Sequence, residues 1–461
     1  MTNSRRRSLR TISTLGVGTL VLASCADDKP LNTFEPRGPK AEIALDLMYP
    51  YIWAIMGFVF VAVVFGGISL TVKNRVKPED FDHDDLPYQR HGNDKLEIGW
   101  TILPAIVLAI VSVPTVISIW KLEEKNDSNQ LDVMVIGQQW WWEYRYDVDG
   151  DGFFRDADGD GEIWGADGEG GDADDREWPL ELALDPDDLV VANELVIPVG
   201  MQVDLTITSR DVIHSYWIPR LNGKRDAVPG RFTTWSLEAD EVGKYTGWCT
   251  EYCGLSHARM RMSTVALEQG DWDQWFANQL KPAEVPTDEA ALAGRTLFQA
   301  NCASCHVIRE NDLDVFGEDE SDPYLNPYNL SQEEYEAVFS EDQRATLGDD
   351  PNAVAFADLI PLTSMAAPDL THVATRSVFA GAIYSQYAEV DADDDNLLEQ
   401  YPNYLTLSED ARWNVPQLTR WIRNAPEQKA MYADGQRGMP AFPGLSATDI
   451  DNLVAYLATL D

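Results

Sequence analysis

Two long apolar segments near the N-terminus dominate the hydrophobic pattern of the chain. The first runs from about Pro50 to Val72 and the second from about Ile98 to Trp120. Each is close to the roughly 20 residues that a helix needs to cross the apolar part of a bilayer. Tryptophan and tyrosine residues stand at the ends of both segments, as is typical of membrane–water interfaces. The pattern therefore predicts a transmembrane hairpin over residues 41–122 rather than buried helices of a soluble protein.

The loop between the two segments indicates which way the hairpin crosses the membrane. Its basic residues are Lys73, Arg75, Lys77, Arg90 and Lys95. Basic loops are retained on the cytoplasmic side. Two spans then return the rest of the chain to the outer face.

Residues 1–25 have the features of a bacterial export signal. A basic start and a short apolar run lead to Leu22-Ala-Ser-Cys25, which matches a lipoprotein cleavage box with Cys25 as the lipidated residue. A general secretory signal is the plainer interpretation, although Ser4–Arg10 faintly resembles a twin-arginine signal. We expect a multi-pass protein of the bacterial cytoplasmic (inner) membrane whose later domains lie on the outer, periplasmic face.

After the hairpin, the pattern changes to short apolar and alternating segments over residues 131–270. The predicted strands include 131–136, 194–199, 203–208 and 231–237. They indicate an antiparallel Greek-key barrel or sandwich. A polar, proline-containing linker at about 280–288 leads to a helical domain over 286–461, which is enlarged by an insertion at 308–363.

The chain is strongly acidic, with 77 acidic and 35 basic residues and a net charge of −42. This charge excludes nucleic acid as a partner, and it suggests a halophilic source, since a hydrated acidic surface stays soluble in concentrated salt. An acidic insert at 147–188 interrupts the β domain. Its two glycine-punctuated loops resemble the start of calcium loops, with carboxylates at Asp147, Asp149, Asp151, Asp156, Asp158 and Asp160. The sequence is compatible with two interpretations of this insert: calcium-binding loops, or acidic loops that are only solvated.

A soft-ligand cluster carries the most specific chemistry of the sequence. Cys249, Cys253, His257 and Met260 lie in one short segment, and His214 ends an upstream strand-like run. Sulfur with imidazole favours copper. Two thiolates can bridge two copper ions, each with one histidine, while Met260 and the carbonyl of Glu251 serve as weak ligands. A structural zinc site and a Cys249–Cys253 disulfide are the alternatives.

A second cysteine motif, Cys302-Ala-Ser-Cys305-His306, matches the attachment site of a c-type haem. Both thiols would bind the haem covalently and His306 would ligate its iron. Met439, followed by Pro440, is the candidate for the sixth ligand of the iron. Met431 and Met365 are the other candidates, and each of them could instead be an ordinary packing residue. A redox dithiol or half of a zinc site is the alternative for the cysteine pair.

Together these motifs resemble subunit II of a haem–copper cytochrome c oxidase with a fused C-terminal cytochrome c domain, the caa3 type. The resemblance covers nearly all of residues 41–461. Besides the copper and haem motifs, it is carried by Leu96–Pro104, Gly137–Tyr144, Lys224–Arg231 and Ala367–His372.

The resemblance implies three structural parts: a two-helix transmembrane hairpin, an antiparallel Greek-key β-barrel of cupredoxin type with a dinuclear CuA centre, and an all-α class I cytochrome c domain. The implied function is electron transfer from a donor through haem c and CuA to haem a of subunit I. There oxygen is reduced to water with proton pumping. The implied partners are subunit I, subunit III and a cytochrome c or another periplasmic carrier.

The resemblance also implies roles for single residues. The copper ligands would be His214, Cys249, Glu251 (through its carbonyl), Cys253, His257 and Met260. The Glu251 side chain would reach a magnesium ion shared with subunit I. Trp140 matches the site where an external cytochrome c delivers electrons. Glu97 matches a carboxylate at the mouth of a proton pathway, with the capping of a membrane helix as its alternative.

Three other functions compete with this interpretation. They are a copper-free subunit II of the quinol-oxidase type, a membrane-anchored redox sensor, and a protein similar to nitrous-oxide reductase. The complete set of ligand side chains argues against the first, and no recognisable output module supports the second. The third class shares CuA but lacks the membrane hairpin and the fused haem segment.

Overall fold

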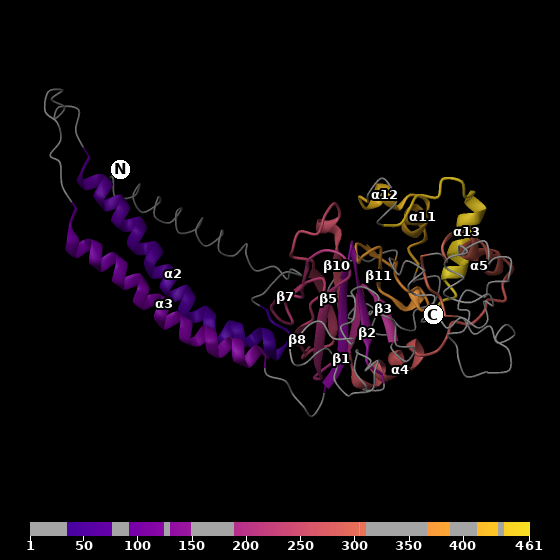
Figure 1. Cartoon of the computed structure of the whole chain (residues 1–461), viewed down its shortest axis with the longest axis horizontal. Coiled ribbons are helices and arrows are strands. Elements are labelled where there is room, and N and C mark those ends of the chain that lie inside the picture. The colour runs from indigo at the N-terminus through magenta and orange to yellow at the C-terminus, as the bar shows by residue number, and fades with distance from the viewer. Residues whose placement is uncertain are drawn as a thin grey trace, which may run out of the picture.

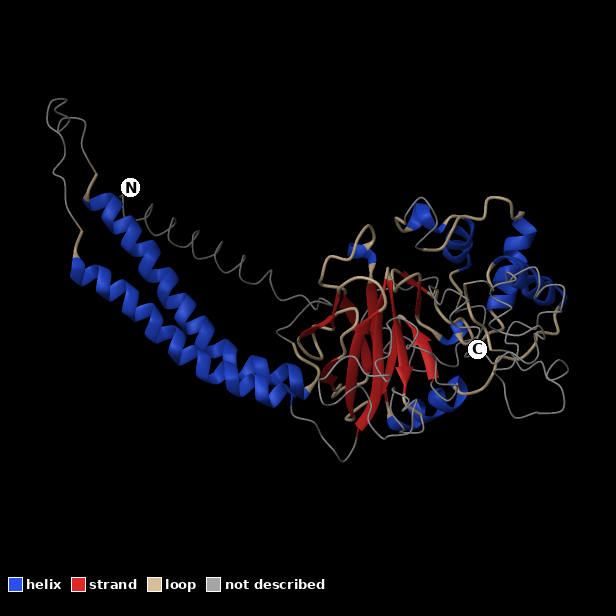
Figure 2. Cartoon of the chain, in the orientation of Figure 1, coloured by secondary structure: helices blue, strands red, loops and turns tan. Residues whose placement is uncertain are grey.

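The computed structural model describes residues 35–75, 92–123, 130–148, 189–303, 305–309, 367–387, 413–431 and 438–461. These residues form three parts, which Figure 1 shows in a row: a helical hairpin, a β-sandwich and a mainly helical C-terminal domain. The sheets occupy the middle, with the long helices on one side and the short helices on the other (Figure 2). The candidate calcium loops beyond Val148, the insertion from 310 onward and Cys25 lie outside the described residues.

The hairpin consists of α2 (Pro39–Lys73) and α3 (Asp94–Glu123). The helices contact each other near the sandwich, where the Thr115 hydroxyl lies 3.7 Å from the Met48 sulfur. Their large apolar side chains face outward, with Phe58 71% and Leu108 68% exposed. Both helices are long and apolar enough to cross a membrane. They extend beyond the predicted apolar segments because the flanking polar residues continue the helical hydrogen bonding.

The hairpin is joined to the sandwich by backbone contacts before α2 and by an ion pair at the end of α3. The Arg37 N–H donates to the Arg220 carbonyl (2.8 Å), and the Asp240 N–H donates to the Arg37 carbonyl (3.0 Å). Arg225 pairs with Glu123 at 3.3 Å. A Cβ atom at Gly38 would overlap the carbonyl oxygen of Glu238. The close approach of the two parts therefore requires glycine at this position.

The sandwich contains a five-stranded sheet in the order β3-β2-β1-β5-β8 and a three-stranded sheet in the order β4-β10-β9, and β6 and β7 pair separately. Its strands are β1 (Gln130–Gln138), β2 (Trp141–Tyr146), β3 (Leu189–Ala192), β4 (Glu194–Pro198), β5 (Gln202–Ser209), β6 (His214–Trp217), β7 (Lys224–Ala227), β8 (Thr233–Leu237), β9 (Gly243–Trp248) and β10 (Arg261–Leu267). The strands β1 and β5 cover the predicted segments 131–136 and 203–208, and β4 and β8 overlap most of 194–199 and 231–237.

The predicted antiparallel barrel is wrong in one respect, because the sandwich has mixed pairing. β1 runs parallel to β5, and β10 runs parallel to β4. Alternating apolar residues identify a strand and its buried face, but they do not specify the direction of its neighbour. The buried core between the sheets is rich in aromatic side chains, among them Trp142, Tyr144 and Tyr146 of β2.

The C-terminal domain follows α4 (Gln269–Gln279). Its helices are α5 (Glu289–Asn301), α11 (Val415–Arg423), α12 (Ala425–Gln428) and α13 (Ala447–Leu457), and a small β-ladder joins β11 (Val378–Phe379) to β12 (Tyr384–Ser385). A Cβ atom at Gly294 of α5 would overlap the Asn452 carbonyl of α13, so glycine lets the two helices approach closely. One turn later, the Phe298 and Tyr456 rings meet edge to face at 5.6 Å.

Candidate functional site

The soft-ligand cluster is built by the end of one strand and the loop between two others. His214 is the first residue of β6, and Cys249 directly follows β9. The loop from Cys249 contains the short helix η2 (His257–Arg259) and returns to β10. The Cys249 N–H donates to the Met260 carbonyl (3.0 Å), which closes the loop. The Thr250 N–H donates to the Ser215 carbonyl (3.0 Å), which fixes the loop against β6.

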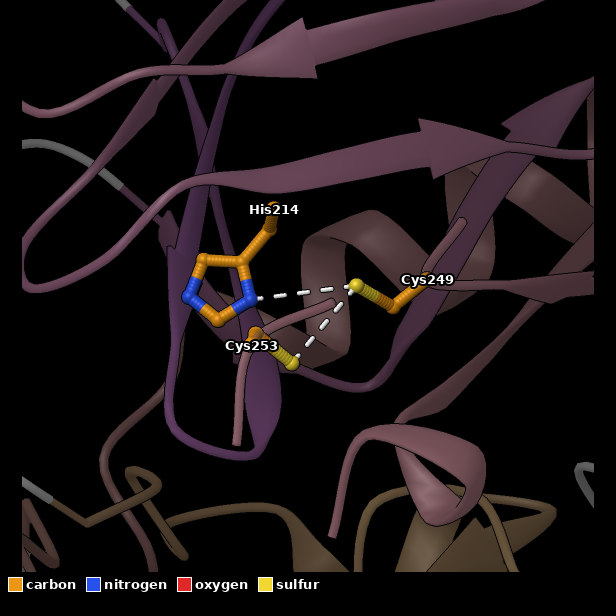
Figure 3. Close-up of side chains that lie close together, drawn as sticks. All are labelled: His214, Cys249 and Cys253. Carbon is orange, nitrogen blue, oxygen red and sulfur yellow. Dashed lines mark hydrogen bonds between the residues drawn. The ribbon is translucent and has the colours of Figure 1, made fainter. Parts of the chain in front are cut away.

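The predicted ligand side chains converge in this loop. The Cys249 and Cys253 sulfur atoms are 3.8 Å apart, and the Nδ1 atom of His214 is 3.8 Å from the Cys249 sulfur (Figure 3). The Cys253 sulfur lies 3.6 Å from Nδ1 of His257 and 3.7 Å from the Met260 sulfur. The Glu251 carbonyl oxygen is 3.3 Å from the Cys249 sulfur. The two thiols thus stand at the centre, with a nitrogen donor beside each.

This geometry excludes the disulfide and fits a pair of metal ions. A disulfide needs sulfur atoms about 2.05 Å apart, which is far less than the observed separation of 3.8 Å. The two sulfurs, two imidazoles, thioether and carbonyl supply the donors that copper prefers. Cys249, Cys253 and Met260 are all buried, so the donors face an interior shielded from water.

The two thiols differ in acidity because they lie side by side. The hydrogen bond from the Cys253 thiol and the nearby His214 ring lower the pKa of Cys249 to about 4. The Cys249 sulfur and burial raise the pKa of the Cys253 thiol. Metal binding would replace the remaining proton, since thiolates are the metal-binding form of cysteine.

Residues around the donors hold the His214 ring in place. Nε2 of His214 lies 2.9 Å from a carboxylate oxygen of Asp211, and this contact turns Nδ1 toward the Cys249 sulfur. A Cβ atom at Gly137 would approach the His214 ring to 2.8 Å. The Trp142 ring lies edge-on to the His214 ring, with centroids 5.8 Å apart. Gly137 therefore provides the space in which the imidazole packs against β1 and β2.

A buried ionic network beside the site was not identified in the sequence. Arg145 and Arg210 bind the Glu143 carboxylate at 2.8 and 3.2 Å. Burial alone would raise the pKa of Glu143, but the two guanidinium groups outweigh it and hold the pKa below its ordinary value. Glu143 belongs to the aromatic run Gly137–Tyr144, whereas no local pattern in the sequence marks Arg210.

Trp140, the predicted site of electron entry, is buried rather than open to solvent. Only 3% of its surface is exposed. Its indole N–H donates to the Cys253 carbonyl at 3.0 Å, which links it to the ligand loop. Its own carbonyl accepts a hydrogen bond from Lys429 of the C-terminal domain at 2.6 Å. Trp140 therefore lies between the candidate metal site and the C-terminal domain.

The second cysteine motif follows α5. Cys302 caps this helix and is half-buried, and Cys305 is exposed. Burial raises the pKa of the Cys302 thiol to about 12. Nδ1 of His306 donates to the Pro368 carbonyl at 2.8 Å, and this bond orients the ring with Nε2 directed away from it. Burial lowers the pKa of His306, so the imidazole is neutral, as a metal ligand must be.

The candidate sixth ligands have different surroundings. Met431 packs against the core of the sandwich, and its sulfur lies against Gly438. Met439 directly follows Gly438, and it is half-buried in the segment that leads to α13. Met365 lies outside the described residues. The surroundings of Met431 are those of a packing residue.

Glu97 lies at the start of α3. Its carboxylate accepts a hydrogen bond from the Asn93 N–H at 3.2 Å, and the Asn93 side chain accepts one from the Leu96 N–H at 3.3 Å. These reciprocal bonds cap the helix, which is the structural alternative predicted for this residue. The Glu251 side chain is exposed on the ligand loop.

Comparison with known proteins gives one consistent family. Residues 180–267 match the model of the family described as cytochrome c oxidase subunit II, periplasmic domain. Cytochrome c oxidase subunit 2 of Alkalihalophilus pseudofirmus is 32% identical over 63% of this chain and 74% of its own length. The corresponding protein of Bacillus sp. PS3 is 30% identical over 66% of this chain and 77% of its own.

One solved structure is also similar to part of this chain. It is the periplasmic domain of subunit II of cytochrome oxidase from Bradyrhizobium japonicum, which is 28% identical. The match covers 34% of this chain and 95% of that domain, with a TM-score of 0.24.

Proposed function

The chain belongs to the cytochrome c oxidase subunit II family, and from this premise we propose that it relays electrons from an external donor through a haem c and a dinuclear copper centre to haem a of subunit I. As a subunit of cytochrome c oxidase, it is part of a haem–copper oxidoreductase. Its two apolar helices fit a membrane protein with a domain on the outer face. In the proposed complex, subunit I reduces oxygen to water and pumps protons, and subunit III is a further partner.

The convergence of the donor atoms around Cys249 and Cys253 is the observation that carries the copper proposal. His214, Cys249, Cys253, His257 and Met260 would hold the two ions by their side chains and Glu251 by its carbonyl. A thiolate-bridged copper pair supplies one-electron transfer with little rearrangement, because the electron is shared by two ions. The protein contributes a closed loop, a buried setting and the Asp211 contact that orients His214.

The haem proposal rests on Cys302, Cys305 and His306. The two thiols would hold the haem covalently, and Nε2 of His306 would bind its iron, since Nδ1 is engaged by Pro368. Met439 is the proposed sixth ligand, because Met431 is used in packing against the sandwich. Covalent attachment at these residues would keep the haem in the C-terminal domain, which lies against the sandwich that carries the candidate copper ligands.

The remaining assignments are extensions of the same proposal. The exposed Glu251 carboxylate would complete a magnesium site with subunit I, and Glu97 would serve the mouth of a proton pathway in addition to capping α3. Lipidation of Cys25, calcium binding at Asp147–Asp160 and a halophilic source remain proposals from the sequence. A copper-free subunit of the quinol-oxidase type would not need the converging donor set.

Rapid mixing of the holo-oxidase with a reduced donor tests the proposed route. We expect the haem c band to change first and the near-infrared copper band to follow. A variant with Cys302→Ala and Cys305→Ala lacks covalent haem, so the donor should reduce its copper much more slowly, while a small chemical reductant still reduces it. Equal rates of copper reduction by the donor with and without haem c would contradict the route.

A further inference from the structure

Two buried charged side chains lie in the contact between the sandwich and the C-terminal domain. Lys429 follows α12 and is 4% exposed, and Glu194 begins β4 and is 3% exposed. Burying a charge is costly unless hydrogen bonds compensate it. Each of these groups has at least one hydrogen-bond partner across the contact, so each loses a partner when the two parts separate.

Lys429 connects three segments that are far apart in the sequence. Its ammonium group donates to the Trp140 carbonyl at 2.6 Å and to the Ala380 carbonyl at 3.2 Å. Trp140 in turn donates to the carbonyl of the copper-ligand candidate Cys253. Burial lowers the pKa of Lys429 to about 7. A neutral amine retains two N–H donors for the two carbonyls, so the contact is satisfied in either protonation state.

Glu194 is a residue of the sandwich whose hydrogen-bond donors include a residue of the C-terminal domain. Its carboxylate accepts hydrogen bonds from the Ser377 N–H at 3.1 Å and from the Ser377 hydroxyl of the C-terminal domain. Within the sandwich, the Ser263 hydroxyl also donates to it at 3.2 Å. Separation of the two parts would remove the Ser377 donors from a carboxylate that is buried in β4.

Further contacts extend this interface over the loop that carries the candidate copper ligands. The Ser256 hydroxyl donates to the Ala430 carbonyl, and the Arg259 guanidinium donates to the Gln428 carbonyl. Met431 and Tyr387 pack into the core cluster of the sandwich. The segment 428–431 therefore lies on the loop that carries Cys253 and His257.

The linker between the sandwich and the C-terminal domain, at about 280–288, is also bonded to the C-terminal domain. Nε2 of His372 lies 2.8 Å from the Lys281 carbonyl, and its Nδ1 atom lies 2.9 Å from the C-terminal residue Asp461. If the C-terminal domain moved away from the sandwich, it would have to break the His372–Lys281 bond together with the buried contacts of Lys429 and Glu194.

We propose that Lys429 and Glu194 are positioning residues that hold the C-terminal domain docked on the ligand loop, so that electrons cross between haem and copper in one fixed arrangement. Trp140 is then covered by the chain's own C-terminal domain, and an external donor reacts with the haem domain instead. This inference rests on the proposed function, because it concerns the path between the two proposed centres.

The test compares Lys429→Met with Lys95→Met in the holo-oxidase. Lys95 is an exposed lysine at the start of α3, outside the contact and the linker, and serves as a matched control. After pulsed reduction of the haem, electron transfer from haem to copper is followed in both variants, together with protease cutting at 280–288. Loss of a buried charged hydrogen-bond donor should weaken docking by about tenfold or more. We expect slower transfer and faster cutting in Lys429→Met only, with unchanged haem and copper spectra.

A disulfide between Glu194→Cys and Ser377→Cys gives a second test that does not depend on a destabilised variant. If the docked arrangement is the working one, the reduced double variant, which lacks the Glu194 carboxylate, should transfer electrons more slowly than the wild-type protein, and formation of the disulfide should restore the rate. Loss of transfer on oxidation, or an unchanged rate in Lys429→Met, would overturn the inference. If the wild-type protein shows no transfer from haem to copper, the proposed function itself fails.

Discussion

Asp211 shows how one residue outside the ligand set shapes the candidate copper site. Its carboxylate accepts from the Gln139 N–H (2.7 Å) and contacts Nε2 of His214 (2.9 Å). Burial alone would raise the pKa of Asp211, but these hydrogen bonds hold it below its ordinary value. The carboxylate is therefore charged, and it fixes the tautomer in which Nδ1 of His214 is the available donor.

Replacing Asp211 by asparagine should weaken copper binding without removing a ligand. Loss of a hydrogen bond that orients a metal ligand typically costs about 10–100-fold in metal affinity. Copper retention is measured during titration with a chelator, with Asp271→Asn at the exposed start of α4 as the control. Equal retention in the two variants would show that the Asp211 contact does not orient the ligand.

Met439→Ala should leave the haem attached but remove its sixth ligand. In the proposed haem site, Cys302 and Cys305 would still hold the macrocycle, so the expected change is a high-spin or water-ligated optical spectrum. Met431→Ala is the matched control, because Met431 packs against the sandwich. A changed spectrum in Met431→Ala and an unchanged one in Met439→Ala would reverse the two roles.

The ligand residues could be predicted from the sequence because most of them are neighbours in the chain. Cys249 to Met260 form one loop, and His214 stands at the end of a strand-like run. The buried contacts of Lys429, Glu194 and Arg210 could not be predicted in this way. Their partners lie far away in the sequence, and a single lysine or glutamate is usually exposed.

At the scale of secondary structure, strands and membrane helices were predictable from local patterns, whereas strand direction and α4 were not. The parallel pairs β1–β5 and β10–β4 depend on the three-dimensional path of the chain. α4 has only 11 residues and a mostly exposed surface. Its buried Trp275 contacts the Tyr146 ring of β2, which is a tertiary contact that its own sequence does not reveal.

The crossing of α5 and α13 should be sensitive to the size of residue 294. In Gly294→Val, a side chain would meet the Asn452 carbonyl, and overpacking typically costs about 1–3 kcal/mol. Thermal unfolding followed at the haem band should therefore begin at a lower temperature, while copper binding is retained. Gly270→Ala is the control, since its Cβ atom would have no neighbour within 4 Å. Equal unfolding temperatures would show that the close helix contact is not needed.

At the scale of the whole molecule, the acidic composition and the arrangement of the parts bear on the choice of donor. The hairpin leaves one end of the sandwich, and the C-terminal domain packs on the other side (Figure 1). A net charge of −42 attracts a basic carrier, but salt screens such attraction over about 10 Å at 0.1 M ionic strength.

The reaction with a basic donor should therefore become slower as salt is added. The second-order rate constant of haem reduction is measured by rapid mixing from low to high ionic strength, once with a basic cytochrome and once with an acidic one. We expect the first rate to fall and the second to rise or stay constant. The same salt dependence for both donors would show that the acidic surface does not steer the encounter.

The central claim is that Cys249 and Cys253 bridge two copper ions, and electron paramagnetic resonance of the purified protein tests it most directly. The oxidised wild-type protein should show the hyperfine pattern of one electron shared by two copper nuclei, beside the signal of a low-spin haem. In Cys249→Ser, the shared-electron pattern should disappear, because bridging needs both thiolates, while the haem signal persists. A wild-type signal from a single copper, or an unchanged shared-electron pattern in Cys249→Ser, would contradict the claim.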